Sequence, residues 1–142
     1  MTRIDFYILA TTDTSGRERF ACRLTEKAFR AGHRIYLNSE SRTQAEQLDQ
    51  LLWTFRPGSF IPHRQIHLGE EDVPVIIGCG EDEPGEVADV LINLAEDTPP
   101  FFSRFRRVAE IIDQDPDRRS EGRRRYRFYQ ERGYPLSHHT IS

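Results

Sequence analysis

The residues best suited to a chemical task lie near the end of this sequence, where arginines alternate with aromatic side chains. Residues 117–130 read DRRSEGRRRYRFYQ. On a helix of about 3.6 residues per turn, one face of this segment presents guanidiniums together with one aromatic ring and one amide. Because like charges one turn apart destabilise a helix, this arginine stripe needs compensation. The stripe consists of Arg119, Arg123, Tyr126, Arg127 and Gln130.

Two kinds of compensation are compatible with the arginine stripe. In the first, the helix surface is solvated, and acids from elsewhere in the chain pair with some of the guanidiniums. In the second, the stripe binds an external anion, which the ring of Tyr126 favours. A nucleic acid would supply phosphates and stacking bases. An acidic peptide would place carboxylates on the guanidiniums and an apolar residue against the aromatic wall.

The charge distribution favours the peptide over the nucleic acid. Residues 69–97 hold ten acids and neither lysine nor arginine, whereas residues 103–132 hold ten arginines and six acids. The formal net charge of the chain is −3, so no strong overall field attracts nucleic acid. We therefore expect any contact with nucleic acid to be indirect.

A glycine-rich turn invites a nucleotide-binding interpretation that the neighbouring residues oppose. Residues 78–80 read GCG after an apolar strand pattern, but the third glycine of a dinucleotide fingerprint would fall at Glu83, and no lysine follows for a P-loop. The acids at 81–83 would also repel a phosphate. We predict a strand-ending turn without a functional nucleotide loop.

The histidines and cysteines do not form a recognisable metal or nucleophile motif. His63 and His67 lie four residues apart, but Pro62 argues against a helical ligand pair, and no third ligand is evident. Cys22 and Cys79 are too few for a cluster and are expected to be reduced and buried. We therefore predict no metal, no cofactor and no catalytic activity in the chain's own right.

Length and composition indicate one globular domain. The chain has 142 residues, of which 37% are hydrophobic and 30% charged. No stretch approaches the roughly 20 apolar residues of a membrane span, and the apolar run 6–10 is too short for a signal-peptide core. We expect a cytoplasmic protein that does not bind membranes.

Apolar periodicity and helix caps predict alternating strands and helices. Such alternation implies right-handed crossovers and a mostly parallel sheet. We predict a single three-layer α/β domain over residues 1–142, Rossmann-like, with residues 135–142 forming a loose tail. The predicted strands are 3–10, 34–37, 73–79 and 87–94. Four helices are predicted: one after a capping box at Ser15, one after a capping box at Ser41, one over 101–112, and one from Asp115-Pro116 to about Arg132.

Several segments, taken in order, resemble a known family. Residues 51–57 read LLWTFRP and lead into SFIPH at 59–63; PVII at 74–77 and DVLINL at 89–94 follow. The end of the chain carries RxxYRxYxxxGY at 123–134. These segments resemble the chi subunit family of bacterial DNA polymerase III holoenzyme over nearly the whole chain.

The resemblance implies a non-catalytic accessory subunit with a nucleotide-binding-like fold that lacks nucleotide-binding loops. By this resemblance, the chain is expected to act as an adaptor in DNA replication. One surface binds the acidic, Phe-ended C-terminal tail of single-stranded DNA-binding protein. Another surface binds the psi subunit, which connects chi to the clamp loader, and a helicase is a further candidate partner for that second surface.

Carried over by position, the resemblance assigns residues to both surfaces. The tail site comprises Arg119, Arg123, Tyr126 and Arg127, with Ile112 walling the pocket from the end of the preceding predicted helix. Family members often have lysine where this chain has Arg127 and a basic residue where it has Gln130, which weakens the case for Gln130.

The psi or clamp-loader surface includes Trp53 and Phe60, for which burial in the core is the alternative. Two rival functions remain open for the chain as a whole. One is an orphan Rossmann-like enzyme that uses a nucleotide, and the other is a direct binder of single-stranded nucleic acid.

Overall fold

The fold is built on one seven-stranded sheet in which every neighbouring pair of strands is parallel. The computed structural model describes residues 1–87 and 89–141. Its strands are β1 (Arg3–Leu9), β2 (Ile35–Ser39), β3 (His63–Gln65), β4 (Val75–Cys79), β5 (Val90–Asn93), β6 (Arg107–Ile112) and β7 (Leu136–Ile141). Its helices are α1 (Thr14–Arg30), α2 (Arg42–Thr54) and α3 (Pro116–Glu131), with a short 3-10 turn, η1 (Phe102–Arg104).

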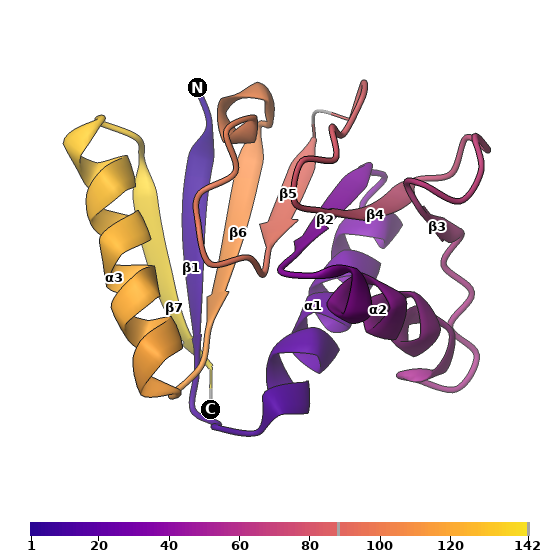
Figure 1. The fold of residues 1–142 in the computed structure, drawn as a ribbon, viewed down its shortest axis with the longest axis horizontal. Helices are drawn as coiled ribbons and strands as arrows, with labels where there is room; N and C mark the ends of the chain where they lie inside the picture. The colour runs from indigo at the N-terminus through magenta and orange to yellow at the C-terminus, as the bar shows by residue number, and fades with distance from the viewer. Residues whose placement is uncertain (88, 142) are drawn as a thin grey trace.

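The layers follow the predicted three-layer α/β architecture. The strand order is β3-β4-β2-β5-β6-β1-β7, with α1 and α2 on one face of the sheet and α3 on the other (Figure 1). Each face has its own apolar core, one beneath α1 and α2 and one beneath α3. In the described part of the chain, no helix combines the length and apolar content needed to cross a membrane.

Two of the three helix starts agree with the sequence patterns. At α2, the Ser41 hydroxyl accepts from the Gln44 amide at 3.0 Å, and the Gln44 side chain accepts from the Glu40 amide at 2.8 Å. At α3, Asp115 is the N-cap and proline occupies the first turn, as predicted. The helix also ends as predicted, because Gly133 adopts the positive φ of 77° that favours glycine just beyond a helix.

The predicted capping box at Ser15 is wrong by two residues. The N-cap of α1 is Asp13, whose carboxylate accepts from the Ser15 amide at 3.1 Å. Glu18, the expected return partner, instead accepts from the Gln44 side chain of α2 at 3.0 Å. An aspartate earlier in the loop therefore outcompeted the serine as the cap, and Glu18 links the two helices.

The predicted helix over 101–112 does not exist. Residues 107–112 form β6, which lies between β5 and β1 in the middle of the sheet. Residues 108–112 are all buried, because a central parallel strand is covered on both faces. Such a strand reads as a continuous apolar run, which periodicity cannot distinguish from a short buried helix.

The terminal segment is also more ordered than predicted. Instead of a loose tail, residues 136–141 form β7, which pairs with β1 from Ile4 opposite Leu136 to Leu9 opposite Ile141. Ser142, the last residue of the predicted tail, lies outside the described residues, as does Ala88 of the predicted strand 87–94. The observed strand β5 is shorter than that prediction.

A close contact between Tyr36 and Gly78 yields a stability prediction. Tyr36 is fully buried, and its hydroxyl finds no hydrogen-bond partner among the described residues. A Cβ atom added at Gly78 would overlap that hydroxyl oxygen. Since an unsatisfied buried polar group costs about 1–3 kcal/mol, Tyr36→Phe is expected to leave the free energy of unfolding unchanged or raise it.

Urea denaturation of three variants tests this prediction. Gly78→Ala should lower stability by about 1–3 kcal/mol through overpacking, and the double variant with Tyr36→Phe should recover part of that loss. A loss of stability in Tyr36→Phe alone would show that the hydroxyl has a partner and would contradict the prediction.

Candidate functional site

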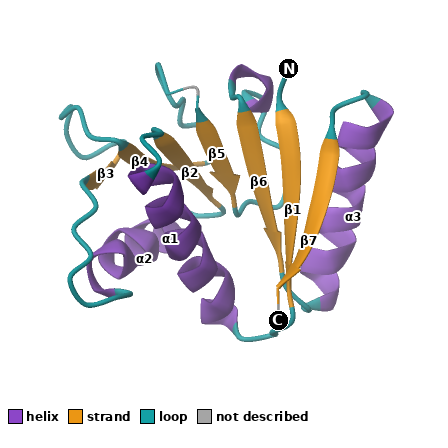
Figure 2. Ribbon diagram, turned by 180° about the vertical axis from the view of Figure 1, so that it is seen from behind, coloured by secondary structure: helices purple, strands orange, loops and turns teal. Residues whose placement is uncertain are grey.

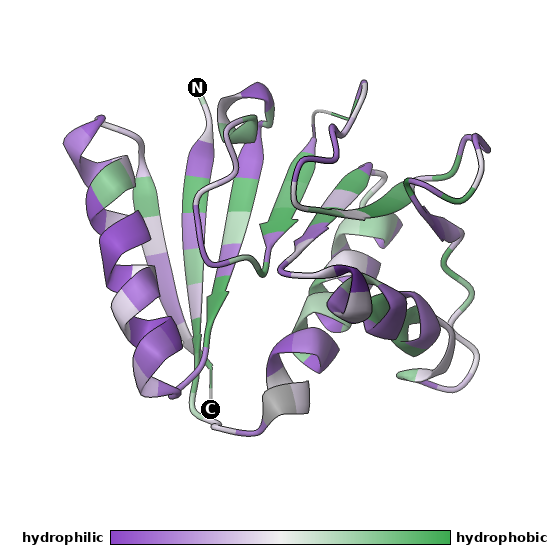
Figure 3. Cartoon of the chain, viewed as in Figure 1, coloured by the Kyte–Doolittle hydropathy of each residue, from purple (hydrophilic) through white to green (hydrophobic). Residues whose placement is uncertain are grey.

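The arginine stripe of α3 faces solvent as the sequence predicted. Arg119, Arg123 and Arg127 are exposed and lie at successive turns of one helix face. Most of α3 is hydrophilic (Figure 3). Within residues 1–87 and 89–141, no carboxylate lies within ion-pair distance of these three guanidiniums. Compensation by acids of the same chain therefore does not apply to them.

The other arginines in the middle of α3 do have acidic partners. Their nearest ion-pair distances are 2.6 Å for Arg118–Asp113, 3.3 Å for Arg124–Asp97 and 3.0 Å for Arg125–Glu110. Burial alone would raise the pKa of the Asp113 carboxyl, but hydrogen bonds from Arg118 hold that pKa below its ordinary value. The helix thus divides its arginines into an internally paired set and a stripe free to bind an external anion.

Tyr126 is held in place beside the stripe. Its ring is half-buried and packs edge-on against Phe6 of β1, with ring centroids 5.2 Å apart and planes inclined by 62°. By helical spacing, Tyr126 shares one side of α3 with the free guanidiniums of Arg123 and Arg127. Tyr126 therefore combines a fixed position with an accessible aromatic surface, which is what an apolar ligand group would need.

Ile112 does not occupy the position that the sequence suggested. It ends strand β6 rather than a helix, and only 7% of its surface is exposed. A Cβ atom added at Gly122 would lie 2.6 Å from its Cδ1 atom. Ile112 therefore lies beneath α3 at Gly122 and supports the helix from below.

A buried polar network fixes α3 to the centre of the sheet, and sequence reasoning missed it. The Glu110 carboxylate of β6 is fully buried and accepts hydrogen bonds from three side chains. The donors are Arg125 Nε at 3.0 Å, the Tyr129 hydroxyl at 2.7 Å and Asn93 Nδ2 at 3.1 Å. Two features of the sequence could have indicated this network. Glu110 is the one acid in the apolar run 108–112, and Arg125 and Tyr129 lie one helical turn apart.

The network extends beyond Glu110 in two directions. Asn38 of β2 donates to the Asn93 side chain at 3.0 Å, and the other end of Arg125 donates to the Glu96 carbonyl at 2.5 Å. Burial and the adjacent Glu110 charge raise the pKa of the Tyr129 hydroxyl, which therefore stays a neutral donor. These bonds join β2, β5, β6 and the loop after β5 to one side of α3.

A second, apolar surface lies at the end of α2 and in the segment that follows it. Trp53 is 48% exposed and Phe60 is 81% exposed, so neither is a core residue. The Trp53 ring packs on His63, with ring centroids 4.2 Å apart. Leu68, in the turn after β3, is also exposed, at 59%, but it is not among the residues assigned to the partner surface.

The histidine beneath Trp53 has a structural role. The His63 ring nitrogens lie 2.7 Å from the Ile61 carbonyl oxygen and 2.9 Å from the Asp49 carbonyl oxygen. Both nitrogens are therefore occupied by the main chain. Among the described residues, no group of three or more histidine, cysteine or acidic side chains is arranged to hold a metal ion.

The glycine-rich turn is occupied by the chain's own acid. The Cys79 amide donates to the Asp82 carboxylate at 3.0 Å, and that carboxylate also lies 3.2 Å from Arg42. A phosphate at this turn would compete with Asp82 for the same amide. The arrangement does not provide a nucleotide loop.

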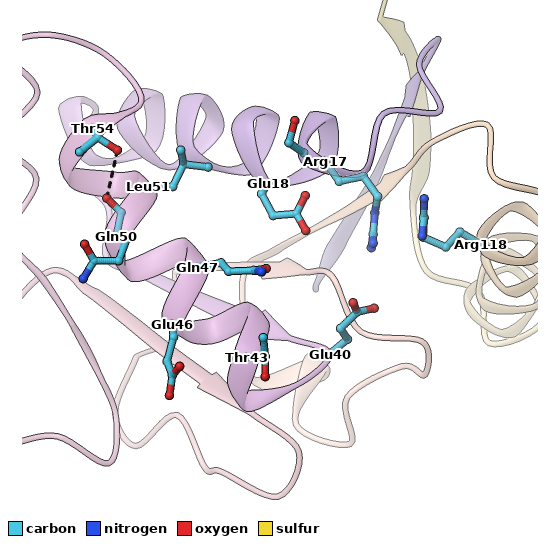
Figure 4. A pocket seen from close by; sticks show the side chains of 11 residues that line it. Arg17, Glu18, Glu40, Thr43, Glu46, Gln47, Gln50, Leu51, Thr54 and Arg118 are labelled. Atoms are coloured by element: carbon cyan, nitrogen blue, oxygen red, sulfur yellow. Dashed lines mark hydrogen bonds between the residues drawn. The ribbon is translucent and has the colours of Figure 1, made fainter.

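A cavity of about 670 Å³ lies between the first turns of α1 and the length of α2, and it reaches Glu40 at the carboxyl end of β2 and Arg118 of α3 (Figure 4). Ligands of open α/β sheets commonly bind at this end of the strands. Here Arg17 is buried and donates to the carbonyls of Ile111 at 3.3 Å and Leu94 at 2.9 Å. The charged side chains in its lining are Glu18, Glu40, Glu46, Arg17 and Arg118. Because the three carboxylates outnumber the two guanidiniums, the net charge of the lining is negative and opposes a phosphate.

Comparisons with known proteins agree with the resemblance. The family model described as "DNA polymerase III chi subunit, HolC" matches residues 1–137. A DNA polymerase III subunit chi of Pseudomonas aeruginosa is 46% identical over 143 residues, covering 99% of this chain and 98% of that protein. Those of Haemophilus influenzae and Escherichia coli are each 28% identical, and each alignment covers 96% of this chain and at least 95% of the relative.

One solved structure is similar to this chain in fold but not in sequence. The crystal structure of T4 UvsW matches with a TM-score of 0.71 at 11% sequence identity, over 99% of this chain and 41% of that chain. The match of the family model over residues 1–137, together with nearly full-length agreement with the relatives, shows that this chain belongs to the DNA polymerase III chi subunit family.

Proposed function

We propose that this protein is a non-catalytic adaptor of the replisome. In this role, its α3 surface binds the acidic, Phe-ended C-terminal tail of single-stranded DNA-binding protein. Its Trp53/Phe60 surface binds the psi subunit or the clamp loader directly, and a helicase is a further candidate for that surface. Membership in the chi family and the presence of two chemically different surfaces support this proposal.

The observation that carries the proposal is the division of the α3 arginines. Three guanidiniums that have no ion-pair partner among the described residues share a helix face with Tyr126, whereas their neighbours on the helix are paired. Guanidiniums bind carboxylates through charge-assisted hydrogen bonds. An aromatic residue at the end of an acidic peptide can pack on Tyr126 while its terminal carboxylate meets an arginine.

Charge reversal at neighbouring arginines tests the tail site. Arg123→Glu is expected to weaken binding of an acidic, Phe-ended peptide by about 1–2 kcal/mol, or roughly 5- to 30-fold. Arg124→Glu, the matched control, changes the adjacent residue, whose side chain already lies against Asp97 and Glu96. Calorimetry should show little effect of this control on affinity. Similar losses in both variants would point to the net charge of the helix and would overturn the stripe as the site.

Changes to the ligand provide a second test. The affinity should fall between low and physiological salt, because the guanidiniums are exposed. Deleting the final Phe of the peptide should abolish binding more completely than removing one acid, because burying an aromatic contributes about 1.5–3 kcal/mol. Equal losses from the two deletions would indicate a diffuse charge patch instead of a pocket. The rival nucleotide-using enzyme would be supported by calorimetric heats with nucleotides, which the adaptor should not give.

A further inference from the structure

Among the described residues, no helix covers β1 and β7 on the side of the sheet that α1 and α2 occupy. Figure 2 shows α1 lying across the middle of the sheet, with β1 and β7 uncovered beside it. Side chains alternate between the faces of a strand, so Arg3, Asp5 and Tyr7 of β1 share this side. His139 of β7 is the register partner of Tyr7. We call this surface the β1–β7 face.

An aromatic pair lies at the centre of the β1–β7 face. The rings of Tyr7 and His139 are stacked, with centroids 4.9 Å apart and planes inclined by 22°. Tyr7 also packs against Phe20 of α1, with centroids 5.3 Å apart, so its position is fixed. The His139 side chain is 45% exposed. The exposed part of the pair is therefore mainly the His139 ring, which lies on the edge strand β7 and is supported from behind by Tyr7.

Positive charge adjoins the aromatic pair. Arg3 and Arg107 are register partners on β1 and β6, a juxtaposition of like charges that disfavours strand pairing. Asp5, which is buried, lies 3.0 Å from Arg107 and 3.1 Å from His139 and is therefore neutralised locally. Among the described residues, no carboxylate lies within ion-pair distance of Arg3. Arg3 is thus available to an external anion.

A small groove separates the open strands from α1. Its volume is about 170 Å³, and apolar side chains from α1, β5 and β6 line much of it, including Leu24, Val90 and Ala109. Lys27 and Arg107 contribute positive charge to the same groove, and Asp5 is the one acid in its lining. An apolar floor with cationic walls suits a ligand that has both flat apolar groups and negative charge.

We propose, in contrast to the expectation from the net charge, that the β1–β7 face binds single-stranded nucleic acid directly, with a base against the exposed His139 ring and phosphates on Arg3 and Lys27. Single strands expose the base faces that a duplex hides, and aromatic side chains bind those faces with little regard to sequence. Sheets that carry stacking aromatics on neighbouring strands bind single strands in this way. The face lies on the opposite side of the sheet from α3, so this inference is independent of the proposed tail site.

Fluorescence anisotropy of a labelled oligothymidylate with the full chain, at several salt concentrations, tests the proposal. Binding should weaken steeply with salt, and Arg3→Ala should reduce the slope of log affinity against log salt by about 0.7, the value for one single-strand phosphate contact. Loss of the stacking ring through His139→Ala, or of the ring that supports it through Tyr7→Leu, should weaken binding by about 5- to 150-fold. Arg3 and His139 are exposed, so their variants should fold.

The charge-reversed α3 variant Arg123→Glu is the control and should bind the oligothymidylate as the parent chain does. Three results would overturn the proposal: no binding at low salt, equal weakening by Arg123→Glu and Arg3→Ala, or binding unaffected by Tyr7→Leu and His139→Ala. Competition for this face by an acidic peptide would assign it to a protein partner instead. Failure of the tail-binding experiment would leave these results unchanged.

Discussion

The Glu110→Ala variant is expected to lose about 3–5 kcal/mol of unfolding free energy, the cost of breaking a buried ion pair from one side. The carboxylate is fully buried, and its removal leaves the Arg125 charge without a counter-ion. The Tyr129 hydroxyl loses its Glu110 acceptor at the same time, and the Asn93 amide keeps only a 3.4 Å bond to the Asp97 carbonyl. Urea denaturation followed by circular dichroism measures the loss.

Two further variants control this experiment. Arg124→Ala removes an exposed ion pair from the next residue of α3 and should cost no more than about 1 kcal/mol. The double variant Glu110→Leu/Arg125→Met replaces both charges with apolar groups and should be more stable than Glu110→Ala. If Glu110→Ala costs no more than Arg124→Ala, the network does not hold α3 to the sheet.

The buried network bears directly on the proposed tail site. Arg125 and Tyr129 occupy the sheet-facing side of α3, while Arg123 and Arg127 occupy its outer side. Specific hydrogen bonds at Glu110 fix the rotation of the helix about its own axis more narrowly than apolar packing alone. The orientation of the arginine stripe is therefore set by residues that cannot contact the ligand.

Local signals predicted the parts of the fold that local chemistry determines. The cap at Ser41, the Asp115-Pro116 start and the Gly133 stop each satisfy end groups of a helix within a few residues. The strand β6 was missed because its burial comes from two layers that are distant in sequence. The strand β7 was missed for the same reason, since only its pairing with β1 makes the polar segment 136–141 extended.

The candidate surfaces also include parts that local sequence predicts and parts that depend on contacts between distant segments. The arginine stripe follows from helix periodicity, which one segment supplies. The sequence left burial and exposure open for Trp53 and Phe60, because exposure depends on what the rest of the chain covers. The β1–β7 face could not be foreseen, since it depends on Tyr7 and His139 becoming neighbours across two strands and on α1 leaving them uncovered.

Some arginines of the basic end of the sequence form ion pairs with acids of its acidic middle in the folded structure. Arg104 pairs with Glu83 at 3.1 Å and Arg124 pairs with Asp97 at 3.3 Å, which joins the basic end to the acidic middle. These pairs are exposed and contribute little to stability. Their larger effect is to use up some arginines, so that the remaining unpaired ones define where an anion can bind.

Phe60→Ala and Arg127→Ala are expected to separate the two proposed functions. Phe60 is 81% exposed, so its truncation should change stability by no more than about 0.5 kcal/mol. If it anchors psi or the clamp loader, the same truncation should weaken that association by about 2 kcal/mol or more, as for an interface hot spot. Arg127→Ala should weaken tail binding and leave the clamp-loader association unchanged, because sites without shared contacts contribute independently.

Leu68→Ala provides the matched control, because it truncates another exposed apolar side chain, 59% exposed, in the turn that follows β3. It should retain both associations in pull-downs with psi or the clamp loader and with single-stranded DNA-binding protein. If Phe60 were a core residue, its truncation would instead lower the stability of the protein by about 3–5 kcal/mol and would impair both associations together. A large fall in the melting temperature of Phe60→Ala, or loss of both partners in either variant, would contradict an adaptor with two independent surfaces.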